Sequence, residues 1–227
     1  MIYVKNPRTA STYFELNFHN KEGIYNNNPI KIWSVGHSWL YPTQIKGWRD
    51  WDFPNQEKNI FRDIPEYRIS ETNIIVTTIR NPFDLLYSYF NYNWGWCRLH
   101  HNLSEDLEYN VNEFEKFVNI YLDSNANFHA PAYKSSLFSQ LKTKDGNWIL
   151  KEDSIILRFE NLKTDIDNFS KLVNIPITNH SAEAINTGKS TKPVEWYDAY
   201  TNVQIDLLTK LWNEDLKYFS YNPPNKK

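Results

Sequence analysis

Cysteine is almost absent from this chain of 227 residues, which has only Cys97. No disulfide can therefore form within the chain, and no cysteine-based metal cluster is available. No apolar run approaches the roughly 18 residues of a membrane-spanning helix, and no charged segment followed by an apolar one marks a leader peptide. We expect a soluble protein of the cytoplasm that has no membrane segment.

An excess of charge of either sign is also missing, because the net charge is −2 at pH 7. Bulk electrostatics therefore give no reason to expect a nucleic-acid partner, and an anionic ligand would have to be held by local cations. Glycine is scarce, and none lies between Met1 and Glu22. The glycine-rich nucleotide loop G-x-x-x-x-G-K-[ST] is thus excluded from this segment. Aromatic residues, in contrast, reach 16% with nine Trp, so some of them could line a ligand site.

Apolar runs and helical periodicity alternate along the chain, which predicts an α/β fold. We expect strands at 2–4, 30–36, 73–79 and 154–159, and helices at 10–20, 82–92, 111–122, 130–141, 163–173 and 202–218. The segments 22–29 and 144–147 are expected to be a loop and a turn. Residues 1–227 are predicted to form a single domain. Its central sheet is expected to be mainly parallel, with helices on both faces in a three-layer arrangement.

The segment 7–12, Pro-Arg-Thr-Ala-Ser-Thr, connects the first expected strand to the first expected helix. Backbone N–H groups at a helix start have no partner inside the helix, and the helix dipole adds positive charge there. Arg8 contributes a permanent charge, while Thr9, Ser11 and Thr12 contribute hydroxyl groups. The pattern predicts a site for a phosphate-like anion, although a helix capped by Ser or Thr after a strand would look the same.

This segment resembles the phosphosulfate-binding loop of sulfotransferases, P-K-[TS]-[GA]-[ST]-[TS], with Arg8 where the family more often has Lys. The resemblance implies that the 5′-phosphosulfate of 3′-phosphoadenosine 5′-phosphosulfate is bound by Arg8, Thr9, Ala10, Ser11 and Thr12. Some relatives have an adenine-stacking Trp at the position of Tyr13, but a core aromatic residue is the equal alternative.

A second motif, RNPFDLLYSYF at 80–90, follows the strand expected at 73–79. It resembles the 3′-phosphate motif of sulfotransferases, R-[ND]-P-x-[DE]-x-x-x-S-x-[YF]. The resemblance implies that Arg80 and Ser88 bind the 3′-phosphate, and Ser88 lies about two turns along the expected helix. In the alternative interpretation, Arg80 pairs with Asp84 and Ser88 lies on the helix surface.

The third motif, ILRFENLKTD at 156–165, resembles the family pattern i-L-R-[YF]-E-[DN]-L, which implies that Phe159 lies near the adenine. The three motifs occur in the family's order over residues 2–165. The polar loop 186–193 resembles a family loop that adds a basic contact to the 3′-phosphate. Lys189 or Lys192 could supply this contact, but solvated lysines are at least as plausible for each.

His37 directly follows the second expected strand, where many sulfotransferases have their catalytic base. Ligands of parallel sheets bind at the carboxyl ends of the strands, and Arg8, His37, Arg80 and Glu160 all follow such ends. Transfer to a hydroxyl requires a base, for which a histidine with a pKa near neutrality is suited. Glutamate acts as base in some relatives, so Glu57 or Glu66 is the reserve candidate.

Five aromatic residues flank His37 and the second motif, and we expect them to line an acceptor site. They are Trp39, Tyr41, Trp48, Trp94 and Trp96. Aromatic faces suit sugar rings or flat phenols, which favours a glycan or a similar polyol or phenol as acceptor, although packing of a long loop is the more frequent role of such residues.

The motifs together predict a sulfotransferase that uses 3′-phosphoadenosine 5′-phosphosulfate, with Arg8 and His37 as catalytic residues and no metal. Two alternatives remain open. The first is a nucleotide or small-molecule kinase of related architecture, and the second is a non-catalytic glycan-binding protein that keeps the fold.

Overall fold

The computed structural model describes residues 1–4, 6, 10–35, 74–92, 111–123, 137–138, 141–142, 147–178 and 195–225. The chain forms two compact units. The first combines Met1–Arg80 with Gln140–Thr187, and the second combines Asn81–Ser139 with Gly188–Lys227. The chain therefore passes between the units three times, and the single domain expected over 1–227 stays a prediction.

The first unit contains a parallel sheet with the strand order β4-β1-β5-β6. Its strands are β1 (Ile2–Val4), β4 (Trp33–Val35), β5 (Ile75–Ile79) and β6 (Ile155–Arg158). β5 is buried along its whole length, as its run of apolar and β-branched residues predicts. The predicted α/β fold with a mainly parallel sheet is confirmed.

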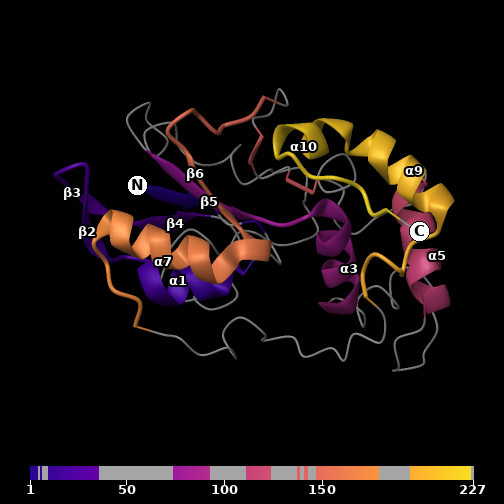
Figure 1. Ribbon diagram of the computed structural model, residues 1–227, viewed down its shortest axis with the longest axis horizontal. Helices are drawn as coiled ribbons and strands as arrows, with labels where there is room; N and C mark the ends of the chain where they lie inside the picture. Colours follow the sequence, from indigo (N-terminus) through magenta and orange to yellow (C-terminus); the bar gives the residue numbers. More distant parts are fainter. Residues whose placement is uncertain are drawn as a thin grey trace, which may run out of the picture. The chain divides into compact units, whose positions relative to one another are not determined.

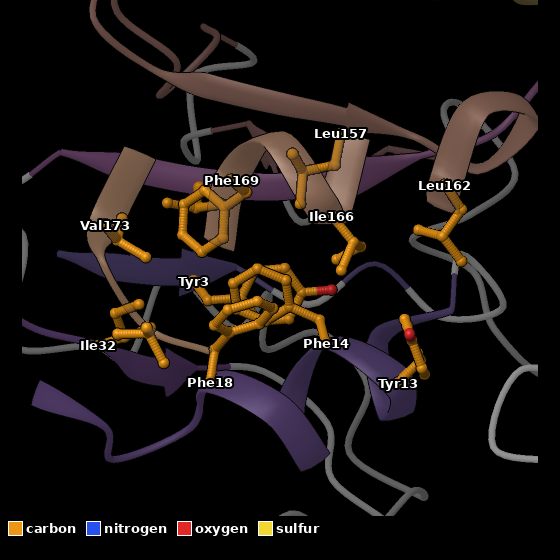
Figure 2. Close-up of a cluster of buried hydrophobic side chains, with 12 residues drawn as sticks. Tyr3, Tyr13, Phe14, Phe18, Ile32, Leu157, Leu162, Ile166, Phe169 and Val173 are labelled. Atoms are coloured by element: carbon orange, nitrogen blue, oxygen red, sulfur yellow. The ribbon is translucent and has the colours of Figure 1, made fainter. Parts of the chain in front are cut away.

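Two helices, α1 (Ser11–Phe18) and α7 (Leu162–Val173), cover one face of this sheet (Figure 1). Figure 2 shows Tyr3 of β1 among the rings of Phe14, Phe18 and Phe169 from the two helices. The Tyr3 and Phe14 rings stack with their centroids 3.8 Å apart, and those of Phe14 and Phe169 lie 5.3 Å apart. This aromatic core fixes α1 against β1, and thereby fixes both ends of the loop that joins them.

The segment expected to be a loop at 22–29 instead begins a β-hairpin, made of β2 (Glu22–Tyr25) and β3 (Asn28–Lys31). Asn26 and Asn27 form its two-residue turn with φ of 50° and 62°. Two positive φ values define the type I′ turn that joins tight hairpins, and asparagine tolerates this conformation better than most residues. The prediction of a loop was wrong because the turn has Asn-Asn instead of the usual glycine.

The single strand expected at 30–36 is divided between two sheets. The hairpin strand β3 ends at Lys31, and β4 of the parallel sheet begins at Trp33. Between them, Ile32 is fully buried in the core of the first unit. The alternation of apolar and polar residues continues through this change of sheet, so the sequence pattern could not reveal it.

The second unit contains the helices α3 (Pro82–Tyr92), α5 (Val111–Leu122), α9 (Asn202–Leu211) and α10 (Asn213–Tyr218) (Figure 1). The helices predicted at 82–92 and 111–122 are confirmed. The long helix predicted at 202–218 is interrupted at Trp212, which has φ −100° and ψ 18°. The Trp212 indole is fully buried and donates a hydrogen bond to the Tyr121 hydroxyl at 3.1 Å. Val203 and Leu211, which are apolar, are exposed.

Most of the helix predicted at 130–141, and most of the turn predicted at 144–147, lie outside the described residues. On either side of that turn, Lys142 and Trp148 form an antiparallel bridge, with the ammonium 4.3 Å from the indole centroid. No helix in the described ranges is both long and apolar enough to cross a bilayer.

Candidate functional site

The carboxyl ends of the parallel strands define the candidate site. Because all four strands run in the same direction, their last residues lie along one edge of the sheet; these residues are Val4, Val35, Ile79 and Arg158. Arg80 and Phe159 directly follow two of these ends. Arg8 and His37 follow the other two in the sequence but lie outside the described residues.

Helix α1 begins directly after a residue in a strained conformation. Ala10 has φ 64° and ψ 26°, the left-handed region that costs a non-glycine residue about 1–2 kcal/mol. Its carbonyl accepts hydrogen bonds from the N–H groups of Tyr13 and Phe14 at 3.0 and 3.2 Å. The backbones of Ser11 and Thr12 form the first residues of α1, where the N–H groups of a helix point away from its body. The predicted helix start is confirmed, whereas anion binding by it stays a prediction.

Tyr13 belongs to the aromatic core of the first unit and is only 5% exposed. It lies at the margin of the cluster in Figure 2. Burial and the neighbouring Asp167 carboxylate raise the pKa of its hydroxyl. The structure therefore agrees with the core interpretation of Tyr13, and its contact with an adenine ring stays an untested prediction.

A buried polar group that the sequence analysis did not identify connects the ends of β1 and β5. The Asn6 side chain is fully buried and donates a hydrogen bond to the carbonyl oxygen of Thr78 at 3.1 Å. The Thr77 hydroxyl donates to the carbonyl oxygen of Val4 at 2.9 Å, and the hydroxyls of Tyr3 and Thr78 are 2.7 Å apart. These bonds fix the start of the predicted phosphosulfate loop to β5, the strand directly before Arg80. A polar residue two positions after a strand and directly before Pro7 was the available signal.

The Arg80 guanidinium lies over the Phe159 ring, with its central carbon 3.9 Å from the ring centroid. Arg80 is only 4% exposed, and a guanidinium keeps its charge even when it is buried. The contact is a cation–π interaction, which is stronger at a desolvated site. Phe159 was expected near an adenine ring; the contact seen here is with Arg80. Glu160, which was also expected at this edge, is exposed.

Ser88 lies on α3 of the second unit and is 5% exposed. The alternative that placed it on the helix surface was therefore wrong. The start of α3 is as predicted, because the Asn81 side chain accepts a hydrogen bond from the Phe83 N–H at 3.0 Å and Pro82 occupies the first helical position. Binding of one phosphate by both Arg80 and Ser88 stays a prediction.

The remaining site candidates lie outside the described residues, and their roles stay predictions. They are Arg8, Thr9, His37, Lys189, the reserve candidates Glu57, Glu66 and Lys192, and the aromatic residues Trp39, Tyr41, Trp48, Trp94 and Trp96. Within the described part of the chain, no three His, Cys, Asp or Glu side chains gather as metal ligands would.

No protein-family model and no curated protein matches the sequence. Among solved structures, the chain is similar to the crystal structure of the mouse sulfotransferase SULT7A1 in complex with PAP. The two are 13% identical, the alignment covers 95% of this chain and 84% of the mouse chain, and the TM-score is 0.48. A likeness at this level does not decide what the chain binds or does. The function is therefore inferred from the motifs and the geometry of the sheet edge.

Proposed function

We propose that this protein is a sulfotransferase that moves a sulfuryl group from 3′-phosphoadenosine 5′-phosphosulfate to an acceptor hydroxyl. The observation that carries the proposal is the buried guanidinium of Arg80 at the carboxyl edge of the parallel sheet. Arg80 follows β5, which pairs with β1, and the segment after β1 resembles the phosphosulfate loop. The two predicted cationic sites thus follow neighbouring strands. The donor has two phosphate groups, one for each of these sites.

In this proposal, the segment 8–12 binds the 5′-phosphosulfate through the Arg8 guanidinium, the hydroxyls and the N–H groups at the start of α1. Arg80 and Ser88 bind the 3′-phosphate, and Lys189 supplies a further basic contact. Tyr13 and Phe159 are the aromatic candidates for contact with the adenine. The left-handed Ala10 supports the first assignment, because strained backbone conformations are concentrated at ligand-binding turns.

Sulfuryl transfer resembles phosphoryl transfer, in which the protein chiefly positions the reactants and stabilises charge. The acceptor oxygen attacks the sulfur in line and forms the new S–O bond, while the bond to the 5′-phosphate breaks. His37 accepts the proton of the acceptor hydroxyl. Arg8 stabilises the negative charge that develops on the leaving phosphate. β4, which precedes His37, pairs with β1, which precedes Arg8, so the two residues follow adjacent strands.

For the acceptor, we propose a carbohydrate or a similar polyol or phenol, bound by the aromatic residues of the segments 39–48 and 94–96. Sugars and phenols both present flat apolar faces that pack on indole and phenol rings. We place this reaction in the cytoplasm and propose that it needs no metal, since Arg8 and the start of α1 supply positive charge.

The direct test is transfer of labelled sulfate from 3′-phosphoadenosine 5′-phosphosulfate to panels of glycans and small phenols. We expect turnover with at least one class. His37→Ala should lower kcat by about 100-fold or more, the usual contribution of a general base, and leave nucleotide affinity unchanged. His19→Ala is the matched control, because His19 lies at the opposite end of α1 from the predicted loop.

Three outcomes would contradict the proposal. ATP turnover without binding of adenosine 3′,5′-bisphosphate would indicate a kinase. Binding of the bisphosphate without transfer to any acceptor would indicate a non-catalytic protein. Full activity of His37→Ala would remove His37 from the mechanism.

A further inference from the structure

Phe159 and Arg80 directly follow adjacent parallel strands, and the strand register brings them together. Ile79 at the end of β5 pairs with Arg158 at the end of β6, so Arg80 and Phe159 each lie one residue beyond a paired position. We propose that Phe159 is a positioning residue that makes the site selective for a 3′-phosphate by orienting the Arg80 guanidinium. This inference rests on the proposed function, and it assigns Phe159 a role other than adenine contact.

The contact restricts a side chain that would otherwise be mobile. An arginine side chain has many rotamers and so a large conformational entropy, and its five N–H donors lie in the plane of the guanidinium. A ring against one face fixes that plane and leaves the in-plane donor directions unobstructed by the ring. Two-point recognition of a phosphate depends on the orientation of this plane. A fixed guanidinium therefore loses less entropy when the phosphate binds than a mobile one.

Hydrogen bonds hold the backbone on both sides of Phe159 in place. The Arg158 N–H donates to the Asp165 carboxylate at 2.7 Å, and the Leu162 N–H donates to the Phe159 carbonyl. Asp165 and Leu162 belong to α7, and Leu162 is buried in the aromatic core. The ring under Arg80 is therefore attached to the same core that fixes β1 and α1. A substitution at Phe159 should change the orientation of Arg80 more than it changes the fold.

The two possible roles of Phe159 predict different results for nucleotides with and without a 3′-phosphate. A ring that contacts adenine contributes equally to the binding of AMP and of adenosine 3′,5′-bisphosphate. A ring that orients Arg80 contributes only to the second ligand. The ratio of the two dissociation constants therefore isolates the 3′-phosphate term, and any change in the adenine contact cancels from it.

The experiment is calorimetric titration of both nucleotides into the wild type, Phe159→Leu, Phe159→Tyr and Arg80→Ala. We expect the wild type to prefer the bisphosphate. Phe159→Leu, which keeps an apolar side chain but removes the π face, should reduce that preference about three- to thirty-fold, the range of a partly to fully desolvated cation–π contact. Phe159→Tyr should retain the preference for the bisphosphate, because it keeps the aromatic face. The affinity of every variant for AMP should stay within about twofold of the wild type. In Arg80→Ala, adding Phe159→Leu should have no further effect on the ratio.

Phe169→Leu is the matched control, because it removes an aromatic ring from the core of the same unit. It should lower the melting temperature and leave the ratio unchanged. An equal loss of affinity for both nucleotides in Phe159→Leu would overturn the inference and assign Phe159 to the adenine, with the proposed function intact. A wild type with no preference for the bisphosphate would overturn the inference together with the proposed function.

Discussion

Tyr3 and Tyr121 carry the most strongly buried titratable groups for which a pKa shift is found, one in the core of each unit. Burial is the main cause that raises the pKa of both hydroxyls far above their ordinary value of 10.0. The Tyr3 hydroxyl lies 2.7 Å from the Thr78 hydroxyl, and the Tyr121 hydroxyl accepts a hydrogen bond from Trp212. Both tyrosines remain protonated in the folded protein at a pH at which the unfolded chain ionises.

These shifts predict a loss of stability at alkaline pH. Above about pH 10 the unfolded chain releases protons that the folded protein retains, so the free energy of unfolding falls by about 1.4 kcal/mol per pH unit for each buried tyrosine. Below that pH the contribution is fully present. In Tyr3→Phe, the free energy of unfolding should fall less steeply above about pH 10, by about 1.4 kcal/mol per pH unit, because one buried tyrosine is missing. Urea denaturation between about pH 8 and about pH 11 measures this. An unchanged slope in this variant would contradict the assignment.

The residues of the candidate site could be predicted to different extents. The position of Arg80 was predictable because a β-branched run before it and Pro82 after it define a strand end and a helix start. Its contact with Phe159 was not, because the register of β5 on β6 is a tertiary feature. Asn6 was missed for a related reason, since its partner Thr78 lies in a strand that is distant in sequence.

At the scale of elements, the start of α3 is fixed by both ends of one amide group. The Asn81 side-chain oxygen accepts from the Phe83 N–H, and its nitrogen donates to the Asn222 carbonyl at 3.2 Å. The Tyr200 hydroxyl donates to the Phe83 carbonyl at 2.6 Å. The helix that carries Ser88 is therefore attached at its first turn to two segments from the carboxyl-terminal part of the chain.

We expect Asn81→Ala to destabilise the protein by about 1 kcal/mol, the typical cost of a lost N-cap. Asn81→Asp should cost less, because a carboxylate still accepts from Phe83 and favours the helix dipole, although it cannot donate to Asn222. Thermal denaturation measures both, with Asn91→Ala at the other end of α3 as control. An aspartate variant as unstable as the alanine variant would show that the bond to Asn222, and not the cap, is the stabilising contact.

The hairpin depends on a close approach at Gly23. A Cβ atom added there would lie 2.3 Å from the Val173 carbonyl oxygen and 2.7 Å from the Ile175 side chain. Gly23→Ala should therefore destabilise the first unit by about 1–3 kcal/mol, as overpacking does, although an alanine is usually favoured in a strand interior. Asn27→Gly in the turn is the control and should be neutral or stabilising. Equal melting temperatures for wild type and Gly23→Ala would contradict this packing.

The elements that sequence analysis predicted well are those whose local pattern and tertiary environment agree. The helix over 111–122 buries Phe114, Phe117, Val118 and Tyr121, as its spacing indicates, whereas Val111, which has the same spacing, is exposed. The hairpin and the interruption at Trp212 were missed because a turn of two asparagines and a buried indole outweigh the local pattern. Propensity and periodicity do not include such tertiary contacts.

At the scale of the whole molecule, the segment 80–90, which we propose binds a 3′-phosphate, is divided in sequence between the two units. Arg80 is the last residue of the first unit before the boundary, and Asn81 begins the second, which also contains Ser88. This division could not be predicted, because no linker or shift in composition marks it in the sequence. Since the chain passes between the units three times, we expect neither unit to retain nucleotide binding as a separate fragment.

Thermal stabilisation by adenosine 3′,5′-bisphosphate, compared with ADP at equal concentration, tests whether the protein has a site for a 3′-phosphate. The two nucleotides are isomers that differ only in where the second phosphate is attached. At about 100 times its dissociation constant, a ligand stabilises by about 2.7 kcal/mol, which for a chain of this size raises Tm by several degrees. We expect such a rise for the bisphosphate, a smaller one for ADP, and loss of the difference in Arg80→Ala. An equal or larger rise with ADP, or an unchanged preference in Arg80→Ala, would contradict it.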